Sequence, residues 1–247
     1  MVLPTYNEAK NIYGILKHVL AHGIVDVLVV HDNSTDGTRG IVGSIMGEHP
    51  NVSMLERPAK LGLGTAYTTG FRWGLERGYD CMMEMDSDFS HDPVIMPSFV
   101  EAIKAGAHLV IGSRYIGGTI SVIGWDFKRL LLSRFGNIYA ATILRMPLTD
   151  LTSGFRAYTR QALEGIDLDS ICSQGYSFQI EMAYYVWCQG LRVREIPIVF
   201  TERAQGSSKM SKSIVREAVK LPWRLRLRTM LGRMSCRPSP EAEKEGR

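Results

Sequence analysis

Blocks of apolar and polar residues predict strands and helices in turn along the first half of the chain. Short apolar runs that end in polar residues predict buried strands at 25–30, 51–56, 79–85 and 107–113, with a strand stub at 1–4. Between them, apolar residues such as Ile12, Ile15 and Leu16 recur at the helical period. This alternation predicts a three-layer α/β fold with a parallel sheet between layers of helices.

The rhythm changes after residue 113. The pattern predicts a helix at 127–144, a loop at 150–156 that enters a short strand, an apolar helix at 177–188 and a last strand at 191–200. The stub at the start is very short for a core strand. We therefore expect the N-terminus to be trimmed relative to the natural fold.

Two carboxylates follow the strand predicted at 79–85. Asp86 and Asp88 lie one residue apart at its carboxyl end, where α/β sheets bind their ligands. This spacing suits one Mg²⁺ or Mn²⁺ that also binds substrate phosphates. A purely structural alternative makes the segment a strand-to-helix turn, with Asp92 as the N-cap and Pro93 as the first helical residue. That alternative accounts for Asp92 but leaves Asp86 and Asp88 unexplained.

Two other turns at predicted strand ends are rich in polar residues and glycine. After the second strand, the turn 31–38 contains Asp36, which can cap the next helix. After the third strand, Gly62 and Gly64 permit a close approach of the backbone, and a helix beginning near Gly64 offers N–H groups to an anion. The spacing is not that of a dinucleotide-binding fingerprint.

Composition indicates an ordinary globular protein of 247 residues, 45% hydrophobic and 22% charged. The length fits one large α/β domain with an extension. Four cysteines without C-x-x-C spacing favour a reducing location and no structural zinc. No apolar run approaches the roughly 18 residues that span a bilayer, so any membrane contact must be peripheral or made through a partner.

Positive charge is concentrated near the C-terminus. Residues 209–233 carry eight basic residues against Glu217, a net charge of +7, which leaves −3 on the rest of a chain whose net charge is +4. Residues 211–221 form an amphipathic helix pattern, Pro222 interrupts it, and 223–228 alternate with an ambiguous period of two. We assign 211–234 to a basic, membrane-proximal segment and 235–247 to a disordered tail. Nucleic-acid binding is disfavoured because Trp223 is the segment's lone aromatic residue.

An ordered series of motifs runs along the chain: Pro4-Thr-Tyr-Asn-Glu8, Asp32 with Asp36-Gly-Thr38, Lys60-x-Gly-Leu-Gly-x-Ala66, Asp86-x-Asp-Phe-Ser-His91, Gly112-Ser-Arg-Tyr115, Gly124-Trp-Asp-x-Lys-Arg129, Thr152-Ser-Gly-Phe-Arg156 and Gly206-x-Ser-Lys209. This series resembles glycosyltransferase family 2 and, within it, the short dolichol- or polyprenol-phosphate mannosyltransferases without transmembrane helices. The resemblance covers about residues 1–212. His31 departs from the family pattern, which usually has an acidic residue there.

The resemblance implies a GT-A fold over residues 1–210, with a Rossmann-like, mostly parallel sheet. It implies transfer of mannose from GDP-mannose to dolichyl or polyprenyl phosphate, with inversion to a β-mannosyl phosphate. It also implies Mg²⁺ or Mn²⁺, small membrane-anchoring subunits as partners, and a peripheral location. That location is the cytoplasmic face of the endoplasmic reticulum in a eukaryote or of the plasma membrane in a prokaryote.

The same resemblance implies roles for individual residues. The residues implied to bind the donor are Pro4, Tyr6, Glu8, Val30, Asp32, Asp86, Ser87, Asp88, Arg114, Arg203 and Lys209. Those implied to hold the acceptor phosphate are Arg114, Arg129 and Ser133, and the metal ligands are Asp86, Asp88 and Ser90. The implied catalytic residues are Asp88, Arg114, Arg203 and Lys209, the last two on a loop that closes over donor and acceptor.

Elementary chemistry is consistent with this reaction. A phosphate monoester has a second pKa near ~6, so the acceptor is already an anionic nucleophile at pH 7 and needs no general base. The site must supply cations that hold two phosphate groups together and stabilise the departing GDP. Two alternatives stay open. One is a UDP-glucose-dependent polyprenyl-phosphate glucosyltransferase. The other is a catalytically silent lipid- or partner-binding subunit, in which His31 would be the first sign that the catalytic site has decayed.

Overall fold

A mostly parallel β-sheet forms the centre of the molecule. The computed structural model describes residues 1–171, 173–202, 212–232 and 234–237. Within them, the central sheet has the strand order β3-β2-β1-β4-β7-β5-β8. Its strands are β1 (Val2–Thr5), β2 (Val27–His31), β3 (Val52–Glu56), β4 (Cys81–Glu84), β5 (Leu109–Ser113), β7 (Arg156–Thr159) and β8 (Val193–Pro197). Strands β6 (Val122–Ile123) and β9 (Phe200–Thr201) pair separately.

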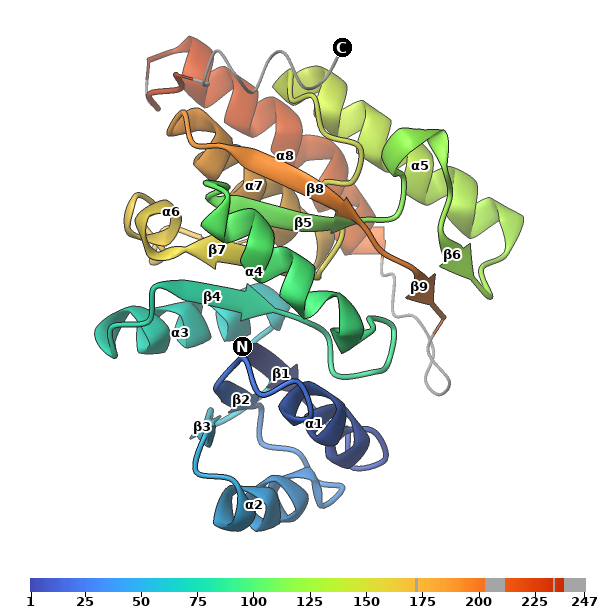
Figure 1. The fold of residues 1–247 in the computed structure, drawn as a ribbon. Helices are drawn as coiled ribbons and strands as arrows, with labels where there is room; N and C mark the ends of the chain where they lie inside the picture. The colour runs from blue at the N-terminus through green and yellow to red at the C-terminus, as the bar shows by residue number, and fades with distance from the viewer. Residues whose placement is uncertain (172, 203–211, 233, 238–247) are drawn as a thin grey trace.

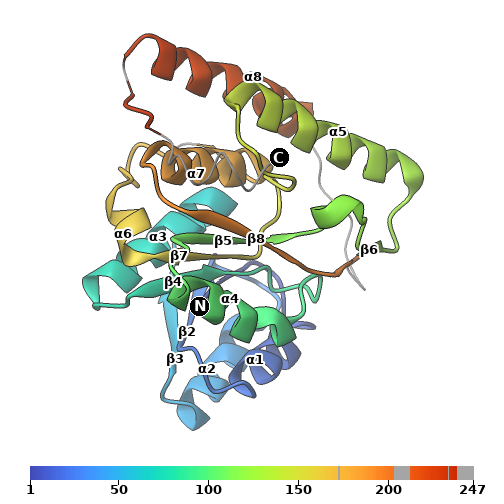
Figure 2. The same ribbon diagram turned by 45° about the horizontal axis from the view of Figure 1, so that its top comes forward.

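Helices cover both faces of this sheet (Figure 1). They are α1 (Ile12–Leu20), α2 (Thr38–Glu48), α3 (Leu63–Glu76), α4 (Met96–Lys104), α5 (Phe127–Leu144), α6 (Arg160–Glu164), α7 (Tyr176–Cys188) and α8 (Lys212–Met230), with short 3₁₀ turns η1 (Pro93–Ile95) and η2 (Ile116–Gly118). Core residues of α1, α2 and α4 pack on one face, and those of α3, α6, α7 and α8 on the other (Figure 2). The predicted three-layer α/β architecture is confirmed.

Strand β2 illustrates why the apolar runs become central strands. All five of its residues are buried, with Val27 and Val29 in one core and Leu28 and Val30 in the other. A strand covered on both faces needs apolar residues on both, and residues 27–30 of β2 are all apolar, with His31 at its carboxyl end. The sheet is mostly parallel, as predicted: β7 is antiparallel to both β4 and β5, while the other neighbouring pairs are parallel.

The turn after β4 contains the helix cap that the sequence predicts. Asp92 accepts a hydrogen bond from the backbone N–H of Val94 at 3.0 Å, and Pro93 begins η1. This turn leads directly into α4. The structural alternative therefore holds for Asp92 and Pro93, and it leaves the two preceding aspartates for a separate role.

Helix α8 differs from the predicted interruption at Pro222, and it also settles the conformation of residues 223–228, whose period of two left it ambiguous. It is continuous from Lys212 to Met230 with Pro222 inside it. Leu221 and Leu225 are 1% and 0% exposed and belong to the core. A proline in a helix interior costs about 3 kcal/mol, which is comparable to the burial of two leucines. Helix α8 is thus a packed layer of the body, and within the described residues no helix is long and apolar enough to cross a membrane.

A disulfide joins Cys188, at the end of α7, to Cys236, with 4.0 Å between the Cα atoms. The backbone N–H of Arg237 also donates to the Cys188 carbonyl at 2.9 Å. The scattered cysteine spacing did not indicate this bond, and the expectation of reduced thiols is corrected for this pair. Within the predicted tail 235–247, Cys236 and Arg237 make these two contacts to α7, and residues 238–247 lie outside the described residues, so the tail stays a prediction.

Candidate active site

A cavity of about 210 Å³ lies at the carboxyl ends of β1, β2 and β4. We call it the β1–β4 cavity. The residues that line it are Pro4, Thr5, Tyr6, Glu8, Asp32, Lys60, Gly62, Leu63, Ala66, Asp86, Ser87 and Asp88. Because β1 lies between β2 and β4, the loops that follow all three strands converge here. Side chains separated by some 80 residues in sequence therefore share one site.

Seven of the predicted donor-binding residues line this cavity: Pro4, Tyr6, Glu8, Asp32, Asp86, Ser87 and Asp88. Val30 does not, because it is fully buried in β2 opposite Pro4 of β1. Arg203 and Lys209 lie outside the described residues. Lys60 was absent from the predicted set although its glycine-rich motif was recognised. Its Nζ lies 4.2 Å from the centroid of the Tyr6 ring.

Asp32 is held by an arginine that the sequence did not single out. Arg57 donates from Nε and Nη2 to the two carboxylate oxygens at 2.6 and 2.7 Å, and both side chains are buried. The same guanidinium donates to the Gly62 carbonyl at 3.2 Å and to Thr65 Oγ1 at 2.8 Å. Arg57 thereby attaches the glycine-rich segment to the carboxylate beside it.

Asp86 and Asp88 are fixed by different neighbours. Tyr67 donates its hydroxyl to Asp86 Oδ1 at 3.3 Å. Asp88 Oδ1 accepts from both the backbone N–H and the hydroxyl of Ser90, at 3.0 and 2.5 Å. Between them, Ser87 donates to the Pro4 carbonyl at 2.8 Å, which ties this turn to β1. The arrangement presents both carboxylates to the cavity from one rigid turn.

The donor set of this turn fits a hard cation. Burial, which outweighs the nearby Arg156, raises the pKa of Glu84 to about 8, which favours the neutral form of that residue at pH 7. Among the described residues no cluster of three or more His, Cys, Asp or Glu side chains could hold a metal. A two-carboxylate site is typical of Mg²⁺ or Mn²⁺ that completes its shell with water and substrate phosphates. Ser90 is buried, does not line the cavity and hydrogen-bonds to Asp88, and its role as a metal ligand stays a prediction.

A second cavity, of about 330 Å³, lies between α5 and α8 and is bounded by the loop that precedes β7. We call it the α5–α8 cavity. The residues that line it are Arg114, Trp125, Arg129, Leu132, Ser133, Phe135, Gly136, Tyr139, Thr152, Tyr176, Ile180, Ala218 and Val219. The three residues predicted to hold an acceptor phosphate, Arg114, Arg129 and Ser133, all line it. Its remaining wall is mainly apolar and aromatic.

Arg114 is anchored by Asp150, a residue that sequence reasoning missed. The guanidinium donates from Nε and Nη2 to Asp150 at 2.6 Å each, and Nη2 also donates to Thr152 Oγ1 at 2.7 Å. Burial is the largest single influence on the pKa of Asp150 and would raise it, but the Arg114 charge and the hydrogen bonds that Arg114 donates together outweigh burial and hold that pKa below its usual value. Among the described residues, Nη1 of Arg114 has no hydrogen-bond partner. The only hint of Asp150 in the sequence is its position, two residues before the motif 152–156.

Arg129 and Ser133 lie one turn apart on α5. Arg129 forms an ion pair with Glu202 at 2.6 Å, and its Cζ lies 4.4 Å from the centroid of the Trp125 ring. Ser133 Oγ accepts from the hydroxyl of Tyr115 at 2.8 Å. The i, i+4 spacing therefore brings a cation and a hydroxyl to the same wall.

The loop from Asp150 to Arg156 connects the two cavities. Thr152 lines the α5–α8 cavity, whereas Gly154 lies against Asp86: a Cβ built on it would be 3.5 Å from Asp86 Oδ2. Arg156 is fully buried and donates to the carbonyls of Leu151, Ser153 and Gln179 at 2.7, 2.8 and 2.7 Å. The loop is rigid because its own backbone carbonyls are tied to this guanidinium.

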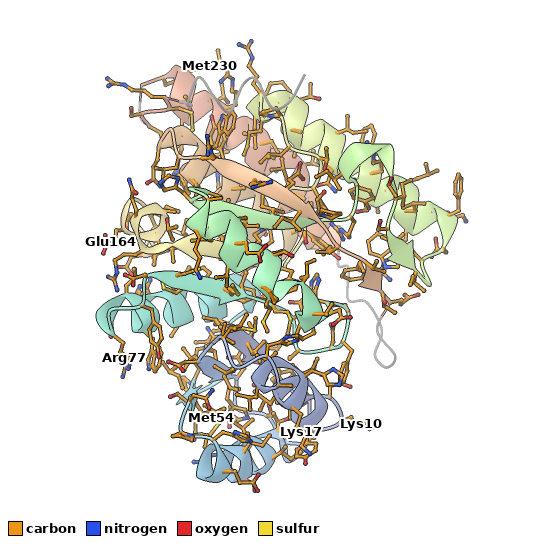
Figure 3. The ribbon with its side chains drawn as sticks, in the orientation of Figure 1. Lys10, Lys17, Met54, Arg77, Glu164 and Met230 are labelled. Atoms are coloured by element: carbon orange, nitrogen blue, oxygen red, sulfur yellow. A yellow bond between two sulfur atoms is a disulfide. The ribbon has the colours of Figure 1, made fainter. Side chains whose placement is uncertain are left out.

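Apolar side chains cover the outer surface near the α5–α8 cavity. On α5, Phe127, Leu131, Phe135 and Ile138 are each more than half exposed, and on α8 the side chains of Val219, Trp223, Leu227 and Met230 are half exposed or more. Each set follows the helical period. The two stripes meet at Tyr139, which stacks on Phe135, accepts from Trp223 Nε1 at 2.9 Å and donates to the Val219 carbonyl at 3.0 Å. Helices α5 and α8 lie side by side in Figures 1 and 2, and Met230 marks the outer end of α8 (Figure 3).

Solved structures identify the class of fold. Glucosyl-3-phosphoglycerate synthase from Mycobacterium tuberculosis, in complex with Mn²⁺, UDP-glucose and phosphoglyceric acid, matches with a TM-score of 0.63 and 20% identity, over 90% of this chain and 78% of that one. A mannosyltransferase from Pyrobaculum calidifontis, in complex with GDP-Man and Mn²⁺, matches with a TM-score of 0.61 and 18% identity, over 99% of this chain and 68% of that one. The fold is the GT-A fold of glycosyltransferases.

Sequence comparison identifies the family. The model described as glycosyl transferase family 2 matches residues 1–167. An undecaprenyl-phosphate mannosyltransferase from Micrococcus luteus is 46% identical over 221 residues, 88% of this chain and 89% of the relative. A polyprenol monophosphomannose synthase from Mycolicibacterium smegmatis is 44% identical over 224 residues, 89% of this chain and 83% of the relative. The chain belongs to glycosyl transferase family 2.

Proposed function

We propose that the protein transfers mannose from GDP-mannose to the phosphate of a polyprenol such as undecaprenol or dolichol. One observation carries this proposal: a carboxylate-bearing cavity and an apolar cavity with cations on its wall are joined by the single rigid loop 150–156. The names of the two relatives at 46% and 44% identity support both mannose as the sugar and polyprenyl phosphate as the acceptor.

The β1–β4 cavity is suited to the nucleotide. In our proposal Pro4, Tyr6 and Asp32 contact the nucleoside, and Asp86 and Asp88 hold Mg²⁺ or Mn²⁺ on the diphosphate. When bound, the cation would supply positive charge that stabilises the departing GDP. The Mn²⁺ in the two related crystal structures supports a divalent cation. Lys60 adds a positive side chain on the same wall.

The α5–α8 cavity is suited to the acceptor. Its phosphate would bind Nη1 of Arg114, the guanidinium of Arg129 and the hydroxyl of Ser133, while the prenyl chain lies against Leu132, Phe135 and the neighbouring apolar residues. Arginine makes bidentate contacts to phosphate and does so best where its geometry is fixed, as Asp150 fixes Arg114. The phosphate oxygen attacks the anomeric carbon directly, and inversion is the expected outcome. The roles of Arg203 and Lys209 stay predictions.

The apolar stripes of α5 and α8 support peripheral membrane association. Exposed apolar patches of this kind mark interaction surfaces, and basic residues beside them add attraction to anionic lipid. Arg216, Lys220, Arg224 and Arg228 of α8 are all exposed. We propose that this surface lies on the bilayer, so that a prenyl chain can enter between the helices. The cytoplasmic face and the small anchoring subunits stay predictions.

A donor screen tests the function. Purified protein is incubated with undecaprenyl phosphate, Mg²⁺ or Mn²⁺, and either GDP-mannose or UDP-glucose, and the lipid product is measured. We expect a mannolipid from GDP-mannose, and we expect chelation of the metal to stop its formation. Product from UDP-glucose alone would identify the glucosyltransferase alternative. Absence of transfer with every donor would favour the silent subunit.

A further inference from the structure

Helix α8 reaches the β1–β4 cavity through two hydrogen bonds. Glu217 of α8 accepts from the backbone N–H of Gln174 at 3.1 Å. The side-chain oxygen of Gln174 in turn accepts from the backbone N–H of Gly64 at 3.3 Å, in the first turn of α3. Gln174 is thus held by α8 on one side and holds the start of α3 on the other. These contacts join segments 110 and 43 residues apart in sequence.

The contact between this loop and the glycine-rich segment is close. A Cβ on Gly62 would overlap the side-chain oxygen of Gln174, and one on Gly64 would overlap the Ser173 carbonyl. Gly62 also has a φ of 104°, a conformation that favours glycine. Since Gly62 and Leu63 line the β1–β4 cavity, a shift of Gln174 must move the wall of that cavity.

The opposite side of the same segment is held by Arg57. Its Nη2 donates to both the Gly62 carbonyl and Asp32. A polar chain therefore runs from Asp32 through Arg57 to Gly62, and from Gly64 through Gln174 to Glu217 on α8. Next to Glu217, Ala218 and Val219 line the α5–α8 cavity. One helix thus contacts the second cavity directly and the first through Gln174.

We propose that Glu217 and Gln174 are positioning residues that couple α8 to the β1–β4 cavity, so that occupancy of the α5–α8 cavity changes the affinity for the nucleotide. The inference rests on the proposed function of the two cavities. A prenyl phosphate that moves α8 would shift Glu217, and the shift would pass through Gln174 to the wall of the nucleotide site. Coupling of this kind is reciprocal, so nucleotide binding would change acceptor affinity by the same factor.

The chemistry of Glu217 makes the test sharp. The backbone N–H of Gln174 needs an acceptor oxygen but no charge. Glutamine at position 217 still offers such an oxygen, whereas alanine does not. A positioning role therefore predicts that Glu217→Gln keeps the wild-type affinity for the nucleotide and that Glu217→Ala weakens it. Glu101→Ala, which removes an exposed glutamate from α4, is the matched control.

The experiment titrates GDP with Mn²⁺ present into each variant by calorimetry, with thermal unfolding as the check on folding. We expect Glu217→Ala and Gln174→Ala to raise the Kd for GDP roughly five- to tenfold, as expected for the loss of one hydrogen bond. Glu217→Gln and Glu101→Ala should stay within about twofold of the wild type. If Glu217→Ala unfolds, Gln174→Ala decides the matter. Wild-type GDP affinity in the folded alanine variants would overturn the inference.

A second arm measures the coupling itself. The titration is repeated with a short-chain prenyl phosphate present. In the wild type we expect the Kd for GDP to change, and in folded Glu217→Ala or Gln174→Ala we expect that change to disappear. An unchanged Kd in the wild type, or the same change in all variants, would refute the coupling. Failure of the wild type to bind GDP at all would instead refute the proposed function.

Discussion

Arg114 and Asp150 form a buried ion pair at the wall of the α5–α8 cavity, with Nε and Nη2 each 2.6 Å from a carboxylate oxygen. The backbone N–H of Arg114 donates to the same carboxylate at 3.0 Å. Glu195 accepts from the backbone N–H of Asp150 at 2.8 Å and so fixes the loop that carries it. The pair fixes the orientation of the guanidinium, and in the proposed function Nη1 would bind the acceptor phosphate.

Asp150→Ala should therefore be strongly destabilising. Removing one partner leaves the Arg114 charge buried and unpaired, which costs about 3–5 kcal/mol. Urea unfolding measures this loss. Arg39→Ala, which breaks the exposed ion pair with Glu56, is the control and should cost less than about 1 kcal/mol. Equal losses in the two variants would mean that the Arg114–Asp150 pair contributes no more than a surface contact.

Asp88→Ala should abolish transfer while the protein stays folded. We expect transition-state stabilisation to fall by several kcal/mol, or at least ~10²-fold in kcat, because one of two carboxylates for the cation is lost. Ser90→Ala should cost only about tenfold, since a hydrogen bond that orients Asp88 is worth roughly 1–1.5 kcal/mol. Transfer rates and Mn²⁺ titrations check both variants. Loss of Mn²⁺ binding in Ser90→Ala as complete as in Asp88→Ala would identify Ser90 as a ligand.

Arg129→Ala should weaken use of the acceptor more than use of the donor. We expect the KM for prenyl phosphate to rise about tenfold or more, as for a lost charge-assisted hydrogen bond, with the KM for GDP-mannose within about twofold. Separate titrations of the two substrates measure this split. Glu202→Ala frees Arg129 from its ion pair and should leave the acceptor KM unchanged or lower it. Equal effects of Arg129→Ala on both substrates would assign Arg129 to the donor or to the fold.

The exposed stripe of α5 should determine binding to lipid. Phe127 and Leu131 are exposed and do not line the α5–α8 cavity. Burying each in lipid is worth about 1.5–3 kcal/mol, so the double change to serine should reduce partitioning onto anionic vesicles by ~10²-fold or more. Sedimentation measures the partitioning, and rising salt should release the wild type because it screens the basic residues of α8.

The matched control for that surface is Ile24→Ser, which changes an exposed apolar residue between α1 and β2. It should leave sedimentation unchanged. The α5 double variant should also keep its activity on a short, soluble prenyl phosphate while losing activity on a membrane-embedded one. Equal loss on both acceptors would show that the stripe serves the fold.

The Cys188–Cys236 disulfide should contribute to stability. Its loop, with a sequence separation of 48, corresponds to about 4 kcal/mol in the chain-entropy model. Dithiothreitol should lower the Tm of the wild type, and Cys236→Ser should unfold at the temperature of the reduced protein. Cys81→Ser should keep its response to the reductant, because Cys81 is a free thiol. If dithiothreitol leaves the Tm of the wild type unchanged, the bond does not form in solution.

Local patterns in the sequence were enough to predict most elements. The helix 127–144 has the same bounds in the structure because Asp126 caps it and accepts from the backbone N–H of Arg129. Strand β2 was recognisable because burial on both faces demands an unbroken apolar run. The two aspartates after β4 could be located because a strand's carboxyl end is a feature of its own short segment. Caps, periodicity and strand ends depend on neighbouring residues, so the chain displays them directly.

Pairings between distant segments were decided by tertiary structure alone. Asp32 meets Arg57, and Arg114 meets Asp150, only because their strand ends share an edge of the sheet. The antiparallel direction of β7 is set by the strands on either side of it, since its own four residues carry no directional signal. Helix α8 continues through Pro222 because burial of Leu225 against the core offsets the missing hydrogen bond. Each of these outcomes depends on contacts whose energy exists only once the sheet has assembled.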